Sequence, residues 1–223
     1  MMRVIRCGTF LLLAIAAVPH ARAQSGTAAP ILDNERISVW DVTLAPGQAF
    51  SREHPENDCV ILFFAGGKVR TTGADGKTRV AAREFGDAVY EPKGTVEKEE
   101  VVSSSPVRFF VVELKDHPVP VLVNQSGYPL SFPRPGAKKI LENDRIIVWT
   151  YTYKPGVPTP MHYHDKDALV VYRYDASVSS TTPDGKSVVN EDKAGTVKFN
   201  KGDRLHVEAL VKGQESVIAT ELK

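Results

Sequence analysis

The chain repeats itself at a spacing of 109 residues, and this repeat constrains the fold more than any other feature of the sequence. The segment at 31–40, ILDNERISVW, returns at 140–149 as ILENDRIIVW. The match continues through the turn residues, and with one deletion both copies end in Glu-Leu-Lys, at 113–115 and 221–223. Chance does not keep one register across a whole domain, so we expect two similar domains produced by gene duplication.

Both copies are predicted to be all-β. Segments 36–44 and 145–153 are rich in the β-branched and aromatic residues that suit a pleated surface, and apolar residues do not follow helical spacing for three turns anywhere after the N-terminus. Further strands are expected at 60–64, 77–82, 88–91 and 108–114, and at 169–174, 187–190, 196–199 and 216–222. Asp-Gly pairs at 75–76 and 184–185 predict tight hairpin turns. Such short strands predict a sandwich or small barrel in each copy.

The N-terminus has the pattern of a secretory signal peptide over residues 1–23. Arg3 and Arg6 precede an uncharged apolar run at 8–18, and Ala21 and Ala23 supply the small residues before a cleavage site. An uncleaved N-terminal anchor is the alternative. We therefore expect an exported protein, periplasmic or extracellular, with domains at 24–126 and 127–223. Between the copies, segment 127–136 carries three prolines and is predicted to be a linker or a crossing strand.

Charge and cysteine content limit the partners. The formal charge is +1, and removing Arg3, Arg6 and Arg22 with the signal peptide leaves 25 basic against 27 acidic residues, a charge of −2. Because no block of Lys and Arg is present, we expect no nucleic-acid partner, and no membrane contact beyond export. Cys59 would then be the one remaining cysteine, so no internal disulfide is expected, and its apolar neighbours predict a core position.

Three histidines of the second copy form the candidate site. His162 and His164 are two residues apart, so on a strand both imidazoles point to the same face. His206 follows the turn at 201–203 and begins another predicted strand. If the two strands are neighbours, three imidazoles converge, and imidazole binds Fe, Mn, Zn, Cu or Ni well. The alternative is two surface histidines and one histidine of the core.

These residues resemble the motifs of the cupin superfamily. Gly156-x5-His162-x-His164 is similar to the first motif, and the segment from Gly195 to His206 is similar to the second. The resemblance implies two tandem double-sheet barrels of the jelly-roll kind, a bicupin, over nearly all of residues 31–223. It also implies a divalent transition metal on the three histidines, with Fe or Mn first and Zn, Ni or Cu as alternatives.

The second copy also departs from the cupin pattern. Ala168 stands where the family has a glutamate ligand, and Asp167 beside it would face the other way on a regular strand. Lys201 replaces a proline. Glu208 shares the face of His206, so it is a candidate fourth ligand, an acceptor for an imidazole N–H, or a general base.

The first copy lacks the histidines. Glu53 and Pro55 occupy the places of His162 and His164, and His54 aligns with Tyr163. Glu97 falls close to the place of His206, at the start of a charged run at 97–100 that is typical of a solvated edge. We interpret this copy as a degenerate, structural partner of the second.

Three functions remain open from the sequence. The first is a metal-dependent oxidoreductase, decarboxylase or isomerase acting on a small molecule in the second barrel. The second is a non-catalytic module that binds a small ligand or a metal. The third is a structural protein of the cell envelope. A homodimer is compatible with each of them.

Overall fold

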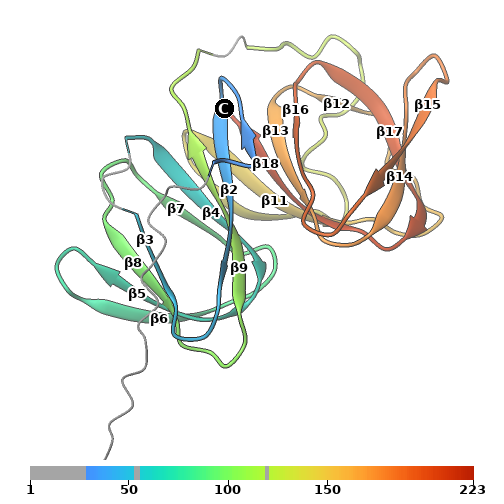
Figure 1. Cartoon of the computed structure of the whole chain (residues 1–223). Coiled ribbons are helices and arrows are strands. Elements are labelled where there is room, and N and C mark those ends of the chain that lie inside the picture. The colour runs from blue at the N-terminus through green and yellow to red at the C-terminus, as the bar shows by residue number, and fades with distance from the viewer. Residues whose placement is uncertain (1–28, 53–55, 119–120) are drawn as a thin grey trace, which may run out of the picture.

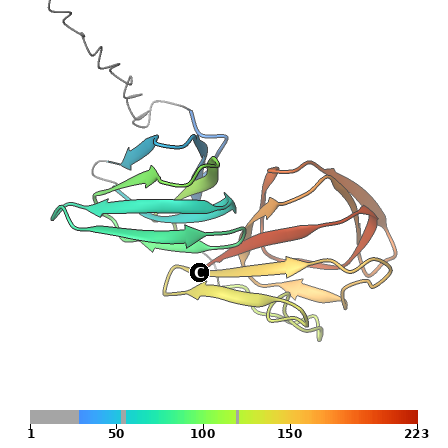
Figure 2. The same cartoon turned by 90° about the horizontal axis from the view of Figure 1, so that it is seen from below.

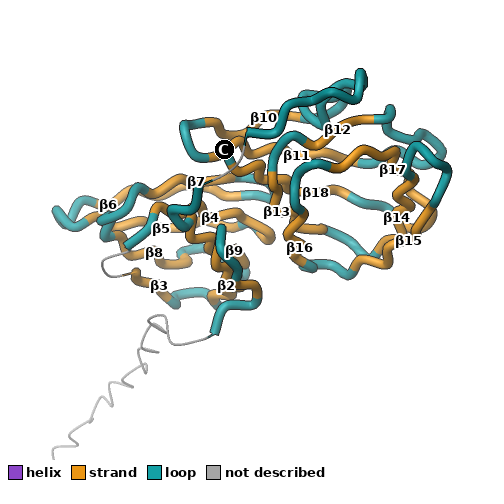
Figure 3. The backbone as a smooth tube through the Cα atoms, turned by 90° about the horizontal axis from the view of Figure 1, so that it is seen from above, coloured by secondary structure: helices purple, strands orange, loops and turns teal. Residues whose placement is uncertain are grey.

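The computed structural model describes residues 29–52, 56–118 and 121–223, which form two β-sheet halves lying side by side (Figures 1 and 2). Over these residues the backbone consists of strands and loops without helix (Figure 3), and no helix is long and apolar enough to cross a membrane. The predicted signal peptide lies outside the described residues, and so do Glu53, His54 and Pro55 of the first copy.

The first half is built from two sheets. Its five-stranded sheet has the order β1 (Leu32–Asp33), β2 (Ile37–Leu44), β9 (Val107–Leu114), β4 (Asp58–Ala65) and β7 (Ala88–Glu91). Its four-stranded sheet has the order β3 (Ala49–Arg52), β8 (Glu97–Val101), β5 (Gly67–Gly73) and β6 (Thr78–Arg83).

The second half repeats this topology strand for strand. Its five-stranded sheet is β10 (Lys138–Glu142), β11 (Ile146–Thr152), β18 (Ser216–Leu222), β13 (Asp167–Tyr172) and β16 (Val197–Asn200). Its four-stranded sheet is β12 (His162–His164), β17 (Arg204–Gly213), β14 (Ala176–Thr181) and β15 (Ser187–Asp192). The predicted fold class, two tandem double-sheet barrels, is confirmed.

The charged run at 97–100 was misinterpreted as a solvated edge. It forms most of β8, which lies between β3 and β5 in the four-stranded sheet, and Glu99 is 3% exposed. The alternation of the strand turns every second side chain inward, so one glutamate is buried although its neighbours are charged. Strands β1, β3, β5, β10 and β14 were also missed, because their sequences are short or polar and lack a clear apolar alternation.

The two five-stranded sheets pack against each other and share one apolar core. Strand β9 has alternate residues in two different layers: Phe109 and Val111 face the inside of the first barrel, whereas Phe110 and Val112 face the second half. The inter-barrel layer continues into β11, β13 and β18 through Val148, Leu169 and Ile218. Because these sheets are buried on both faces, neither barrel presents this surface to solvent.

Two ion pairs related by the duplication join the barrels. Arg36 binds Asp167 at 2.9 Å, and Arg145 binds Asp58 at 3.0 Å. Arg145 and Asp167 are Arg36 and Asp58 displaced by 109 residues, so each copy gives the same arginine and the same aspartate to its neighbour. The contact therefore has approximate two-fold symmetry.

The connecting segment 127–136 runs along the second barrel. Backbone N–H of Tyr163 donates to the carbonyl of Pro129, and N–H of Ser131 donates to the carbonyl of Tyr163, both at 2.8 Å. Leu130 and Tyr163 form an isolated parallel bridge. The segment thus extends the edge of the four-stranded sheet beside β12, as a crossing strand would.

Loss of the Arg36–Asp167 pair should weaken the joint between the barrels. In Arg36→Ala, Asp167 keeps its bond from the Gly202 N–H but loses its buried cation, so we expect a loss of about 2–4 kcal/mol in the free energy of unfolding. Arg70→Ala removes a more exposed pair with Glu100 and should cost less than about 1 kcal/mol. Urea denaturation measures both, and equal losses would contradict a structural role for the inter-barrel pair.

Candidate metal centre

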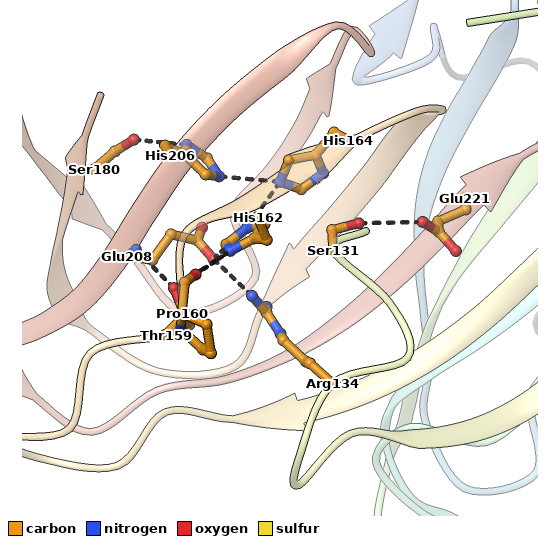
Figure 4. A network of polar contacts seen from close by, with 10 residues as sticks. All are labelled: Ser131, Arg134, Thr159, Pro160, His162, His164, Ser180, His206, Glu208 and Glu221. Atoms are coloured by element: carbon orange, nitrogen blue, oxygen red, sulfur yellow. Dashed lines mark hydrogen bonds and ion pairs between the residues drawn. The ribbon is translucent and has the colours of Figure 1, made fainter. Parts of the chain in front are cut away.

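Strand pairing brings the three histidines of the second barrel together. In the antiparallel ladder of β12 and β17, His162 lies opposite His206 and His164 lies opposite Arg204. The three imidazoles turn toward one another inside the barrel (Figure 4), with ring centroids 4.8–5.0 Å apart. His206 lies 42 residues after His164 in sequence, and the non-sequential pairing of β12 with β17 closes that gap.

The spacing of the ring nitrogens fits a single metal ion. His164 Nε2 lies 3.2 Å from His162 Nε2 and 3.0 Å from His206 Nε2. Metal–imidazole bonds of about 2.1 Å at angles of about 90–110° place the nitrogens about 3.0–3.4 Å apart. At most one pair of these three nitrogens can share a proton in a hydrogen bond. The remaining lone pairs repel one another at this distance, and a cation bound between them would remove that repulsion.

In two of the rings the Nδ1 atom, which points away from the common point, is hydrogen-bonded to an oxygen atom. His162 Nδ1 donates to the carbonyl of Pro160 at 2.8 Å, which leaves the Nε2 lone pair for a metal. His206 Nδ1 lies 2.8 Å from the Ser180 hydroxyl. Residues from the loop before β12 and from β14 therefore orient the two rings toward the common point.

Burial keeps all three imidazoles neutral. It is the main cause that lowers the pKa of His206, to about 4, and it also lowers the pKa of His162. The pKa of His164 falls far below its usual value through burial, reinforced by the charge of Arg204. Neutral imidazole is the form that binds metals, so the site needs no deprotonation near neutral pH.

Glu208 lies beside the histidines and is held by three groups. Its Oε2 is 3.8 Å from His162 Nε2 and 3.1 Å from Arg134 Nη1, and Tyr153 donates its hydroxyl proton to the carboxylate. Burial raises the pKa of Glu208, but Arg134 and the histidines more than offset this, and the pKa lies below its usual value. The carboxylate is therefore a mostly buried anion. It lies near Nε2 of His162, the nitrogen that faces the other histidines, and not near Nδ1.

Arg134 is a residue of the candidate site that the sequence reasoning missed. It belongs to the connecting segment, and its side chain, which is 8% exposed, reaches the Glu208 carboxylate (Figure 4). Its guanidinium lies 4.0 Å from the centre of the Tyr151 ring and 4.7 Å from that of Phe132. The two cupin motifs span residues 156–164 and 195–206, so they carried no signal for a side chain supplied by the connection between the barrels.

The missing carboxylate ligand is not replaced by its neighbour. Ala168 lies in the barrel wall and is buried, while Asp167 points out of the barrel to Arg36 of the first half. This agrees with the expectation that Asp167 faces the other way. A metal at this site would have three histidine ligands from the protein.

The interior of the first barrel has two phenylalanine rings at positions where the second barrel has a tyrosine and a valine, and both interiors contain a glutamate. Phe63 and Phe109 pack with ring centres 5.7 Å apart, and the strand registers align them with Tyr172 and Val217 of the second barrel. In the same registers Glu99 aligns with Glu208, because Thr71 pairs with the former and Ser180 with the latter.

No metal-ligating group is formed by the described residues of the first barrel. Glu97, in the place of His206, makes two bonds to Arg79 at 2.9 and 2.7 Å, and is thus occupied by a cation. Among all described residues, the three histidines of the second barrel are the group of three or more side chains that could hold an ion.

Comparison with known proteins supports the architecture. No protein-family model and no curated protein matches the chain. Solved structures do match. A cupin 2 conserved barrel domain protein from Leptotrichia buccalis is 15% identical with a TM-score of 0.52, covering 87% of each chain. AerE from Microcystis aeruginosa is 12% identical with a TM-score of 0.60, covering 87% of this chain and 96% of its own.

A third similar structure belongs to a metalloenzyme. Oxalate decarboxylase from Bacillus subtilis, which has Mn(II) centres, is 14% identical with a TM-score of 0.57. The match covers 85% of this chain and 69% of the decarboxylase. At these identities the likeness concerns the fold. The chain has the fold of the cupin superfamily, in two tandem copies within one polypeptide.

Proposed function

We propose that the second barrel is a metal-dependent enzyme centre that acts on a small molecule. The observation that carries this proposal is the convergence of His162, His164 and His206, with the Nε2 of His164 3.2 and 3.0 Å from the other two Nε2 atoms and a carboxylate that is 18% exposed beside them. A passive metal or ligand module would need the histidines, but it would not need a buried anion held next to the ligands at the cost of desolvation.

Fe(II) or Mn(II) is the first choice of metal. Three neutral imidazoles leave further coordination positions free, and imidazole also suits Zn, Ni and Cu. The Mn(II) centres of the similar oxalate decarboxylase support manganese as a candidate. A bound ion would supply Lewis acidity or redox chemistry at those free positions, in an oxidoreductase, decarboxylase or isomerase reaction.

Within this proposal Glu208 is the proton carrier. Its Oε2 faces the convergence point, and the Tyr153 hydroxyl and the Arg134 guanidinium hold the carboxylate in place. The backbone N–H of Glu208 also donates to the Thr159 hydroxyl, which fixes the position of the backbone that carries the carboxylate. An anion held this way accepts a proton from a substrate bound next to the histidines and returns it to the product.

Metal analysis tests the site directly. We expect the protein to bind about one equivalent of Mn(II) or Fe(II), and His206→Ala to lose most of that binding because one of three ligands is gone. His117→Ala removes an exposed histidine outside the barrel and should bind as the wild type does. Elemental analysis after reconstitution gives the stoichiometry, and equal metal content in all three proteins would overturn the proposal.

Glu208→Gln separates a proton carrier from a ligand. The three imidazoles are unchanged in this variant, so the visible spectrum of the Co(II)-loaded protein should keep its bands, with affinity reduced by no more than about tenfold. Turnover of any substrate found by screening should fall by about 10²–10⁴-fold. A changed Co(II) spectrum with severe loss of affinity would make Glu208 a fourth ligand instead.

We also infer that the protein is exported after cleavage behind Ala23, on the pattern of Arg3, Arg6, the apolar run and the small residues. The mature protein should be found in the periplasm or medium with Gln24 as its first residue. Cell fractionation with mass spectrometry of the N-terminal peptide measures this. A cytosolic protein that retains residues 1–23 would contradict export, and a membrane-bound one would indicate an uncleaved anchor.

A further inference from the structure

We propose that Arg204 is the anion-binding residue of the second barrel and that the substrate is a small carboxylate. This inference rests on the proposed function, because it assigns the substrate class of the same site. It starts from the face that β17 turns into the barrel. Residues 204, 206 and 208 alternate with the outward ones, so Arg204, His206 and Glu208 share that face.

Arg204 has no ion-pair partner among the described residues. Its Nε donates to the carbonyl of Lys201 at 2.6 Å, and the charges of Glu208 and Asp167 act on its guanidinium only from beyond ion-pair distance. Both terminal guanidinium nitrogens are therefore available. A guanidinium presents these nitrogens as a fork that matches the two oxygens of a carboxylate.

The other charged side chains inside the barrel have partners, which are cations for Glu208 and Asp192 and neutral hydrogen-bond donors for Glu215 and Glu221. Arg134 binds Glu208, and Lys198 binds Asp192. Glu221 accepts from the Trp149 indole at 2.8 Å, while Asp167 faces the first half. Glu208 is balanced by Arg134, so on the face of β17 that carries His206 the guanidinium of Arg204 is the charge without a counter-ion, and a divalent ion would add to it. Burial raises the pKa of Glu215 and Glu221, which weakens the negative charge that they could set against it.

The cations of a second hollow differ from Arg204 because each of them has a carboxylate partner. A hollow of about 430 Å³ between the barrels is lined by symmetric pairs of cations, Arg36 with Arg145 and Lys115 with Lys223. Each of these four has a carboxylate partner, namely Asp167, Asp58, Asp33 and Glu142 respectively. The hollow therefore has no unpaired cation to offer an anion, in contrast to Arg204.

The order of the groups limits the size of the ligand. Same-face neighbours on a strand are about 6.6–6.8 Å apart. Arg204 lies opposite His164 in the ladder, so it stands next to the convergence point, and Glu208 lies on the other side of His206. A molecule of two to four carbons would reach from the guanidinium to the histidines, with its reacting atoms next to Glu208.

Calorimetric titration of the Mn(II)-loaded protein with glycolate and with its neutral analogue glycolamide tests the inference. We expect glycolate to bind at least tenfold more tightly than glycolamide, and Arg204→Met to weaken glycolate by tenfold or more while glycolamide is unaffected. Arg204→Lys keeps the charge and should retain part of the difference. Arg70→Met, which removes a cation of the first barrel, is the matched control.

Repeating the titration without metal distinguishes the two proposals. If the wild type takes up no Mn(II) but glycolate binding still depends on Arg204, the anion site stands and the metal function fails. If metal binds normally and glycolate binds equally to wild type and Arg204→Met, or to neither, the inference is overturned. Arg204-dependent binding of inorganic phosphate in place of glycolate would likewise overturn the carboxylate assignment. Circular dichroism confirms that each variant is folded.

Discussion

The packing of one five-stranded sheet against the other is the constraint on which the rest of the structure depends. Each of these sheets is buried on both faces, and the layer between the barrels contains Val39, Phe110, Val148 and Ile218 among its fully buried residues. The Arg36–Asp167 and Arg145–Asp58 pairs fix the same arrangement from both sides. Because the contact is nearly symmetric, a side-chain substitution on one five-stranded sheet has to be compensated by a substitution on the other. We attribute the well-kept register of segments 31–40 and 140–149 to this mutual dependence.

The interiors of the barrels are free of that dependence, and there the copies differ. Each interior is lined by the alternate residues of the same strands, so β4 can place Phe63 inside the first barrel while keeping Leu62 in the shared layer. The corresponding position in the second barrel is Tyr172, next to a polar interior. One barrel can thus pack aromatic rings at interior positions where the other places its histidine site, although both keep a glutamate at the same place, Glu99 or Glu208.

Much of the architecture could be predicted from the sequence, because duplication and strand alternation act locally. The repeat gave the two halves, and the spacing of His162 and His164 gave their common face. The outward direction of Asp167 followed from the same alternation. Three features depended on tertiary contacts instead. Glu99 is buried although it lies in a charged run, and the inter-barrel ion pairs join residues 131 and 87 positions apart. Arg134 reaches the barrel from a segment whose prolines indicate only a connection.

Arg134 and Arg204 have different roles in the site because their surroundings differ. Arg134 is enclosed by Tyr151 and Phe132 and has a carboxylate partner, so its charge serves to hold Glu208 as a buried anion. Removing it would leave that anion unpaired and should raise the pKa of Glu208, since Arg134 is the main charge that lowers it. Arg204 has no such partner, so its charge is directed to whatever enters the barrel. The charge of Arg134 thus keeps Glu208 ionised, whereas the charge of Arg204, next to three imidazoles and without an ion-pair partner, favours an anionic ligand.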